Sequence, residues 1–499
     1  MDHNRVVVLE PVNAFLLREH GLLVDGKTVA AQSGQRTEVR NPATGQVIAS
    51  VADGNEQDVD VVVQSAHRAF TAGVWSGLRP AERERILLKL ADVLEAHAEE
   101  LAQLETLNQG KSIHISRAIE VGASIEFVRY MAGWATKLGG ETMDVSIPVP
   151  PGTRYTAYTR RQPVGVVAGI VPWNFPLMIA IWKMVPALAA GCTVVLKPST
   201  ETPLTALRLG ELALEAGIPP GVVNVLTGRG ARAGQALAGH PLVSKVSFTG
   251  STEIGKTIGH TAIDNMTRFS LELGGKNPMI MLGDVDVDKA IQGALMGGFL
   301  NQGQVCAAAS RLYIQRSKFN QVVEGLAAAA NSMTLGSGLD LNAQVNPLVS
   351  ARQQQSVCRL IDTARSEGAS ILAGGGAADL PGYFVKPTII VNAAQHSTIV
   401  REEVFGPVLV ALPFDHPDEA IAMANDSRYG LAASLWTNDL SAAMNLVPRI
   451  EAGTVWVNSH IPLDPSLPFG GFKQSGIGRE FGRGAVENFT ETKSVCIAH

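Results

Sequence analysis

The sequence predicts an α/β protein with two α/β units in tandem, each built on a mainly parallel sheet, and a small β arm. Short apolar runs alternate with helical segments from Gly165 onward, and a second series of this kind begins near residue 278. Buried strands separated by helices are typical of parallel, doubly wound sheets. The chain has 499 residues, of which 46% are hydrophobic and 17% charged, so it can bury several cores.

Two long helices are predicted ahead of the first sheet. In residues 55–72 the apolar side chains recur at helical spacing, and Asn55 is suited to cap the first turn. Residues 80–108 carry a second apolar stripe that starts after Pro80, a residue favoured in a first helical turn. We therefore expect the first part of the chain to be mainly helical.

The strands of the two sheets are predicted in two series of apolar runs. The first series is VGVVAGIV, CTVVLK, VVNVLTG and KVSFTG, with TPLTALRLGELALEAG as a crossover helix between two of the runs. The second series is MIML, RLYIQ, TIIV, PVLVAL, LAASLW and GTVWVN, with a helix at 351–366. Because strands joined by a crossover helix run in the same direction, each series predicts a parallel sheet.

The β arm is predicted from two alternating segments at the margins of these units. Residues 153–162 (TRYTAYTRRQ) are rich in Thr and Tyr and predict a strand of a hairpin. The last stretch, NFTETKSVCIAH, alternates as well and is expected to pair with it. Such an arm could pair across subunits, although an internal sheet edge would give the same pattern.

Composition argues against a nucleic acid or a membrane as partner. The 41 Lys and Arg residues and the 46 Asp and Glu residues give a formal charge of −5, and there is no long basic run. A membrane span needs roughly 20 apolar residues without a break. The most apolar region, residues 164–196, is interrupted by Pro172, Asn174, Pro176, Lys183 and Pro186.

The cysteines and histidines indicate a reduced protein without a metal site. The four cysteines, at 192, 306, 358 and 496, are too scattered for a disulfide framework, which favours the cytoplasm. The apolar stretch near the N-terminus is broken by Glu10 and Pro11 and does not resemble a signal peptide. The 11 histidines show no metal-binding spacing. We expect Cys192, Cys358 and Cys496 to lie in apolar surroundings as buried small side chains.

Two segments could bind an anionic ligand. FTGSTEIG places Gly250 and Gly255 around a strand-to-helix turn, whose free N–H groups suit a phosphate. Lys197, in KPST, lies at the carboxyl end of a strand, where α/β sheets bind ligands. Taken singly, an ordinary glycine turn and a solvated lysine explain these segments better than a ligand site does.

Three further residues could perform acyl chemistry together. Cys306 in NQGQVCAAAS has small neighbours that let a substrate carbon approach the sulfur. Glu272 lies between two leucines at a strand end, where burial would raise its pKa toward that of a general base. Asn174 in VPWNFP is framed by prolines and could donate to an oxyanion. Each has a structural alternative, but together they supply a nucleophile, a base and an oxyanion donor.

The motifs along the chain resemble those of the aldehyde dehydrogenase superfamily over nearly the whole length. They occur in the order PWNFP, KPS, FTGSTEIG, LELGGKNP, NQGQVC, EEVFGPV and PFGGFKQSGIGRE. Within the superfamily, GIVPWNFPLM, FLNQGQVCAA and GTVWVNSH are most similar to enzymes that oxidise phenylacetaldehyde. The resemblance implies a Rossmann-like NAD(P)-binding domain over 11–139 and 164–274, a catalytic domain over 275–474, and an oligomerisation domain over 140–163 and 484–497.

The same resemblance implies roles for individual residues. Cys306 would be the nucleophile, Glu272 the general base and Asn174 the oxyanion donor, with Glu480 behind the base. The residues implied to bind the cofactor are Ile170, Pro172, Trp173, Lys197, Ser199, Thr200, Gly230, Phe248, Gly250, Ser251, Glu403 and Phe405. The residues implied to form the substrate tunnel are Phe175, Trp182, Phe299, Leu300, Leu463 and Phe469.

The function expected from this resemblance is NAD(P)-dependent oxidation of an apolar aldehyde, phenylacetaldehyde first, to its acid by a homotetramer or homodimer. Another apolar or aliphatic aldehyde, or a cysteine hydrolase without a redox cofactor, are the alternatives. One departure concerns the cofactor: the family often has Glu three residues after the KPS lysine, where this chain has Thr200, with Glu201 displaced by one. We therefore expect NAD as cofactor, with some use of NADP.

Overall fold

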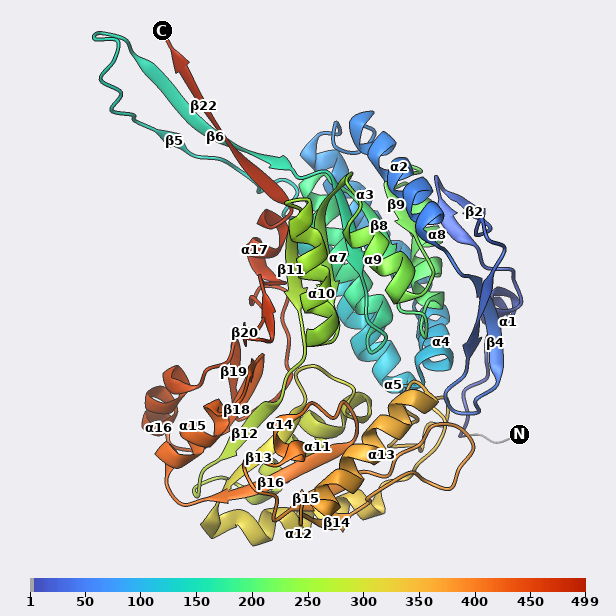
Figure 1. Ribbon diagram of the computed structural model, residues 1–499, viewed down its shortest axis with the longest axis vertical. Helices are drawn as coiled ribbons and strands as arrows, with labels where there is room; N and C mark the ends of the chain where they lie inside the picture. The colour runs from blue at the N-terminus through green and yellow to red at the C-terminus, as the bar shows by residue number, and fades with distance from the viewer. Residues whose placement is uncertain (1–3) are drawn as a thin grey trace.

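The computed structural model describes residues 4–499 and contains two α/β units and a projecting β arm (Figure 1). The first sheet is parallel at its centre, where β9, β8, β7, β10 and β11 run in one direction. This arrangement confirms the predicted α/β class. In spatial order the first sheet comprises β2 (Lys27–Val29), β1 (Leu22–Val24), β9 (Val223–Val225), β8 (Thr193–Lys197), β7 (Val166–Ile170), β10 (Val243–Thr249), β11 (Arg268–Glu272) and β21 (Gly476–Ile477).

Helices cover both faces of the first sheet, because successive side chains of its buried strands point to opposite faces. Val167 and Val194 belong to one apolar cluster, whereas Val166 and Val195 belong to the other. The first cluster includes α3 (Pro80–Ala96), α4 (Ala98–Gln109), α6 (Ala123–Ala132), α7 (Pro176–Ala190) and α8 (Leu204–Glu215). The second includes α2 (Glu56–Thr71), α9 (Gln235–Ala238) and α10 (Thr252–Asp264).

The second unit repeats this layered plan with a different set of elements. Its sheet comprises β14 (Ser370–Ala373), β15 (Thr388–Val391), β16 (Val408–Phe414), β13 (Ala309–Gln315), β12 (Asn277–Met281), β18 (Ala432–Trp436) and β19 (Thr454–Val457). One face packs on α13 (Ala351–Ser366), α14 (Thr398–Arg401), α15 (Pro417–Asn425) and α16 (Leu440–Leu446). The other packs on α11 (Val287–Phe299) and α12 (Arg316–Ser332).

The arm projects from the first unit and carries the C-terminus (Figure 1). It consists of β5 (Thr142–Met143), β6 (Tyr155–Pro163) and β22 (Thr490–Ala498), with β6 in the middle. β22 pairs antiparallel with β6 over its whole length, from Thr490 opposite Pro163 to Ala498 opposite Tyr155. The predicted pairing of the two alternating segments is therefore confirmed.

Three sequence-based expectations need correction. The helix predicted at 80–108 is interrupted at His97, which leaves the helical region (φ −101°, ψ 14°) and separates α3 from α4. The first part of the chain also holds β1 to β4, with β3 (Arg36–Arg40) and β4 (Val47–Ala52) forming a ribbon. These strands are too short or too polar to show a clear alternation. Cys496 is exposed on the arm, whereas Cys192 is buried and Cys358 is half-buried.

The remaining elements are short connections. They are α1 (Glu10–Leu16), α5 (Ile113–Ile115), η1 (Ser116–Gly122), η2 (Gly230–Gly234), η3 (Leu300–Gly303), β17 (Tyr429–Gly430), η4 (Val447–Arg449), β20 (Phe472–Lys473) and α17 (Gly482–Glu487). Residues 4–499 contain no helix that is long and apolar enough to cross a membrane.

Candidate active site

Two cavities meet at Cys306 and Asn174, which line both of them. One is an apolar cavity of about 270 Å³, and the other is a more polar cleft of about 350 Å³. A reacting atom at this junction could be approached from the apolar side by one ligand and from the cleft by another. The junction is thus the candidate active site.

The backbone around Cys306 is fixed by side chains from neighbouring elements. Asn277 Nδ2 donates to the Cys306 carbonyl over 2.8 Å and to the Ala308 carbonyl over 2.9 Å. His460 Nε2 lies 2.8 Å from the carbonyl oxygen between them, that of Ala307. Gly275 allows the close approach, because a Cβ there would lie 2.5 Å from the Cys306 oxygen.

The Cys306 thiol is held in its neutral form by its surroundings. Burial, together with the charges of Glu403 and Glu272, raises its pKa to about 12. Negative neighbours disfavour a thiolate in the same way as the loss of water does. A raised pKa disfavours the thiolate, which is the nucleophilic form of the side chain.

Glu272 ends β11, is not among the residues that line the two cavities, and carries a buried carboxyl group whose charge acts on Cys306. It is 5% exposed, and neither of its oxygens has a hydrogen-bond partner among the described residues. Burial, and then the charge of Glu480, raise its pKa well above the ordinary value. Lys183 pairs with Glu480 over 2.9 Å and offsets part of that effect. Such a carboxyl group can accept a proton from water near neutral pH.

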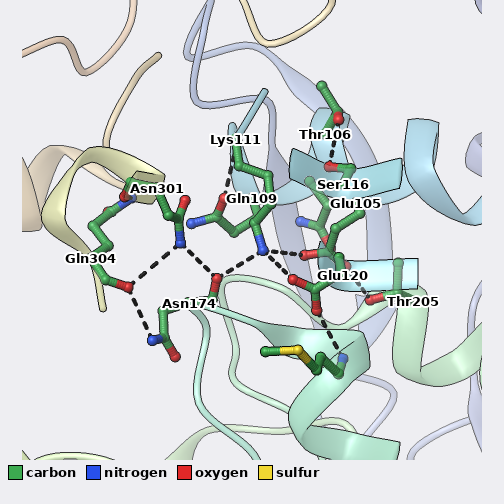
Figure 2. Close-up of polar contacts among 12 residues, drawn as sticks. Glu105, Thr106, Gln109, Lys111, Ser116, Glu120, Asn174, Thr205, Asn301 and Gln304 are labelled. Atoms are coloured by element: carbon green, nitrogen blue, oxygen red, sulfur yellow. Dashed lines mark hydrogen bonds and ion pairs between the residues drawn. The ribbon is translucent and has the colours of Figure 1, made fainter. Parts of the chain in front are cut away.

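Asn174 lies in the loop between β7 and the first turn of α7. Its side-chain Nδ2 donates to the backbone carbonyl of Gln304 over 3.0 Å. Its backbone carbonyl accepts from the Lys111 ammonium and from Asn301 Nδ2, each over 2.9 Å. Figure 2 shows these contacts side by side. The amide is thereby fixed at the junction of the two cavities, where it could donate to an oxyanion.

The cleft contains seven of the residues predicted to bind the cofactor: Pro172, Trp173, Phe248, Gly250, Ser251, Glu403 and Phe405. Ser251 caps α10, whose first turn presents N–H groups that suit a phosphate. The Trp173 and Phe405 rings lie edge to face with centroids 5.1 Å apart. Glu403 accepts from the Gly275 N–H over 2.9 Å, and burial raises its pKa to about 7. This donor set and these aromatic faces fit a dinucleotide.

The other five predicted cofactor residues lie outside the lining of this cleft, four of them at or just after the carboxyl ends of β7 and β8 and one at the start of η2, after β9. They are Ile170, Lys197, Ser199, Thr200 and Gly230. Lys197 donates to the Pro198 carbonyl over 2.9 Å, and burial lowers its pKa to about 8. The Thr200 hydroxyl donates to the Gly228 carbonyl over 3.4 Å. Their role toward a cofactor stays a prediction.

The apolar cavity contains five of the six residues predicted for the substrate tunnel: Phe175, Trp182, Leu300, Leu463 and Phe469. Phe299 does not line this cavity, and its place in a substrate tunnel stays a prediction. It ends α11, and its side chain is buried with Trp436 and Leu409 in the core of the second unit. The aromatic wall is completed by Phe127 and Phe481, and the Trp182 and Phe481 rings lie 4.7 Å apart.

Sequence reasoning missed residues on both sides of the junction. In the cleft these include Arg352 and Gln353 from α13, and in the cavity Phe127 from α6. Phe481 directly follows the GRE motif and could have been found from it, whereas the others lie far from every motif. Among residues 4–499 there is no group of His, Cys, Asp and Glu that could hold a metal ion.

Comparison with known proteins identifies the family. Residues 28–495 match the aldehyde dehydrogenase family, so the chain belongs to this family. It is an NAD(P)-dependent aldehyde dehydrogenase. Among curated relatives, a phenylacetaldehyde dehydrogenase of Pseudomonas fluorescens is 53% identical over 96% of both chains. A mitochondrial aldehyde dehydrogenase of Rattus norvegicus is 44% identical over 92% of this chain and 87% of the rat protein.

Solved structures agree with this assignment. The NAD⁺ complex of an aldehyde dehydrogenase from Bacillus cereus has a TM-score of 0.96 and 45% identity, and the match covers 99% of both chains. A betaine aldehyde dehydrogenase from Staphylococcus aureus, solved with NAD⁺, has a TM-score of 0.94 and 39% identity over 97% of both chains.

The environment of Cys306 predicts a steep pH dependence of its alkylation. Iodoacetamide reacts with the thiolate, so a raised pKa means slow reaction at pH 7 and a rate that rises as the pH passes 9. Glu403→Gln removes one of the causes of the shift and should move this rise to lower pH. Mass spectrometry of the peptide that contains Cys306 separates its reaction from that of the exposed Cys496. A plateau already reached below pH 8 would contradict the prediction.

Proposed function

We propose that the protein oxidises phenylacetaldehyde to the carboxylic acid, with Cys306 as nucleophile, Glu272 as general base and Asn174 as oxyanion donor. The observation that carries this proposal is the position of Cys306 and Asn174 at the junction of an apolar cavity and a cleft whose lining suits a dinucleotide. The charge of Glu272 contributes to the raised pKa of Cys306, which supports its proposed role near the nucleophile. We propose that these three residues together oxidise an aldehyde to an acid.

The proposed reaction begins with covalent capture of the aldehyde. The Cys306 thiol gives up its proton to solvent, the thiolate sulfur bonds to the carbonyl carbon, and the carbonyl π electrons move to the oxygen. Asn174 Nδ2 and the Cys306 backbone N–H hold that oxyanion. NAD, when bound in the cleft, supplies the oxidant by accepting a hydride, with its two electrons, from the same carbon.

Glu272 completes the reaction by activating water against the Cys306 thioester. Its carboxylate takes a proton from a water molecule while the water oxygen bonds to the acyl carbon. The C–S bond then breaks, the acid leaves, and the thiolate of Cys306 is restored. The raised pKa of Glu272 suits this step, because a base of higher pKa accepts the proton more readily.

Phenylacetaldehyde is favoured by the character of the apolar cavity. None of its lining residues carries a charge, and its wall includes the rings of Phe175, Trp182 and Phe481. An arene can stack on such rings and gain from their burial. The phenylacetaldehyde dehydrogenase of Pseudomonas fluorescens, 53% identical to this chain, supports the same substrate. Another apolar or aliphatic aldehyde is the second candidate, since the same apolar surface would accept it.

NAD is the cofactor, held by the residues that line the cleft. The first turn of α10, with Ser251, suits the pyrophosphate, and the Glu403 carboxylate suits the hydroxyls of a ribose. Lys197 and Thr200 are proposed to face the adenosine ribose. Thr200 carries no charge, so it would not repel the additional phosphate of NADP.

A second copy of the chain is the proposed partner, in a homodimer or homotetramer. The arm exposes Val149 and Ile497, which are 69% and 48% accessible in the single chain. Its strand β22 leaves one edge unpaired. A free apolar strand edge is a template for pairing with another chain. Because the nucleophile is a thiol that must stay reduced, we expect the enzyme to work in the cytoplasm.

The choice of substrate is tested with a panel of three aldehydes. Phenylacetaldehyde should give a higher kcat/KM with NAD than hexanal, and a charged aldehyde such as glyoxylate should be the poorest, because the cavity offers no partner for a carboxylate. NADH absorbance at 340 nm is the measurement. Cys306→Ala, which keeps the backbone contacts, should abolish NADH formation with all three. NADH formation by a folded Cys306→Ala protein would rule out the mechanism, and a cofactor-independent thioesterase activity alone would favour the hydrolase alternative.

The two chemical stages can be separated at Glu272. Glu272→Gln removes the proton acceptor for water, so steady-state turnover should fall by about 10²–10⁴-fold, the usual contribution of a general base. The pre-steady-state burst of NADH should remain, because the first stage does not need activated water. Stopped-flow absorbance measures both. Equal losses of burst and turnover would assign Glu272 to deprotonation of Cys306 instead.

Thr200 is tested through the choice of cofactor. Thr200→Glu introduces a carboxylate that would bind both ribose hydroxyls of NAD and repel the 2′-phosphate of NADP. The kcat/KM with NADP should therefore fall selectively. Thr200→Gln, which has the same shape without the charge, is the matched control. An unchanged NAD-to-NADP ratio in the Glu variant would mean that position 200 does not face the ribose.

A further inference from the structure

A buried polar cluster contacts the backbone of Asn174, and its charged side chains are not among those that line the two cavities. Its centre is Lys111, which follows the end of α4 and is 0% exposed. Around it lie Glu105 from α4, Glu120 from η1 and Thr205 from α8, which the chain brings together from separate helices (Figure 2). A buried lysine is rare unless its charge is paired and its donors are satisfied. The cluster therefore requires an explanation.

All three N–H groups of the Lys111 ammonium are used. Two contact carboxylates, that of Glu105 over 3.3 Å and that of Glu120. The third is donated to the backbone carbonyl of Asn174 over 2.9 Å. Burial, and then the charge of Glu120, raise the pKa of Glu105 to about 8.

The contacts of this cluster fix the chain on both sides of Asn174. Asn301 gives the Asn174 carbonyl a second donor over 2.9 Å. Four residues after Asn174, in the first turn of α7, the N–H of Met178 donates to Glu120 Oε1 over 2.8 Å. The ring of Phe175, between them, lies 4.3 Å from the Lys111 nitrogen. The ion pair of Lys111 and Glu120 thus holds both Asn174 and the first turn of α7.

We propose that Lys111, held by Glu105 and Glu120, is a positioning residue that sets the orientation of the Asn174 carboxamide toward the oxyanion. This inference rests on the proposed role of Asn174 and extends it. The direction of the Asn174 carbonyl fixes the ψ angle of that residue and, with it, the direction in which its side chain leaves the backbone. A hydrogen bond from a buried ammonium is stronger than a neutral one, so it holds that direction firmly.

A purely structural role is the rival explanation, and the chain offers a matched control for it. Arg208 on α8 pairs with Glu100 on α4 over 2.7 Å, and both side chains are largely buried. This pair joins α8 to α4, the helix that precedes Lys111. Among residues 4–499, neither of its side chains hydrogen-bonds to Asn174 or lines either cavity. Arg208→Met should therefore reproduce the loss of packing without the loss of orientation.

The test is a double-mutant cycle on the NADH burst with phenylacetaldehyde and NAD. Lys111→Met should slow the burst by about 10- to 100-fold, because a small misplacement of a catalytic group costs up to 10²-fold. Asn174→Ala should slow it by about 10²–10³-fold. In the double variant the Lys111 change should cost no more than about threefold beyond Asn174→Ala, since the group that it positions is gone. The KM for NAD should change little, and Arg208→Met should keep the burst rate of the unmodified enzyme.

The outcomes separate the two proposals. A slow Asn174→Ala variant with fully additive losses in the double variant would overturn the positioning role alone, as would an equal loss in Arg208→Met. A normal burst in Asn174→Ala would overturn the role of Asn174 and the inference that rests on it. If Lys111→Met does not fold, Glu120→Gln replaces it in the cycle. The glutamine keeps an acceptor for Met178 but removes the charge that holds the ammonium, and the same non-additivity with Asn174→Ala is expected.

Discussion

The site depends on one costly constraint, a carboxyl group that is buried without a hydrogen-bond partner. Glu272 is enclosed at the end of β11, and both of its oxygens are unpaired among the described residues. Burying an ionised carboxylate in this way is strongly unfavourable, which raises the pKa of Glu272. A stable fold would normally satisfy such a group with a backbone donor. Leaving it unpaired keeps its lone pairs available for a ligand or for water.

The surrounding charges make this constraint tolerable. Lys183 and Glu480 form a buried pair next to Glu272, and the lysine partly offsets the repulsion between the two carboxyl groups. On the other side of the junction Lys111 serves two carboxyl groups in the same manner. The proposed catalytic residues are thus supported by buried ion pairs of Lys111 and Lys183. The cavity proposed for the substrate is lined by uncharged residues. Low local polarity strengthens every electrostatic contact made there.

Much of the fold could be predicted from the sequence because its signals are local. The apolar runs became strands, residues 351–366 are the bounds of α13, and the two segments of the arm pair as expected. Phe299 could not be placed, because a residue at a helix end can face either the core or a cavity. Its neighbour Leu300, at the start of η3, faces the cavity.

The cluster around Lys111 could not be predicted from the sequence, for a different reason. Its contact with Asn174 joins residues 63 positions apart, and no periodicity or motif links the two segments. Only packing of α4, η1 and the loop before α7 brings them together. The catalytic residues were found because short motifs carry them, whereas the side chains that support these residues are distributed over several helices.

The carbonyls of residues 306, 307 and 308 are all held by neighbouring side chains, from Asn277 and His460. None of these contacts involves the sulfur, so the backbone that presents it does not depend on which side chain stands at position 306. The backbone of this loop can accordingly keep its contacts when the side chain at position 306 is replaced. A side chain of similar size, such as that of serine, would meet the same three backbone contacts between the same two cavities.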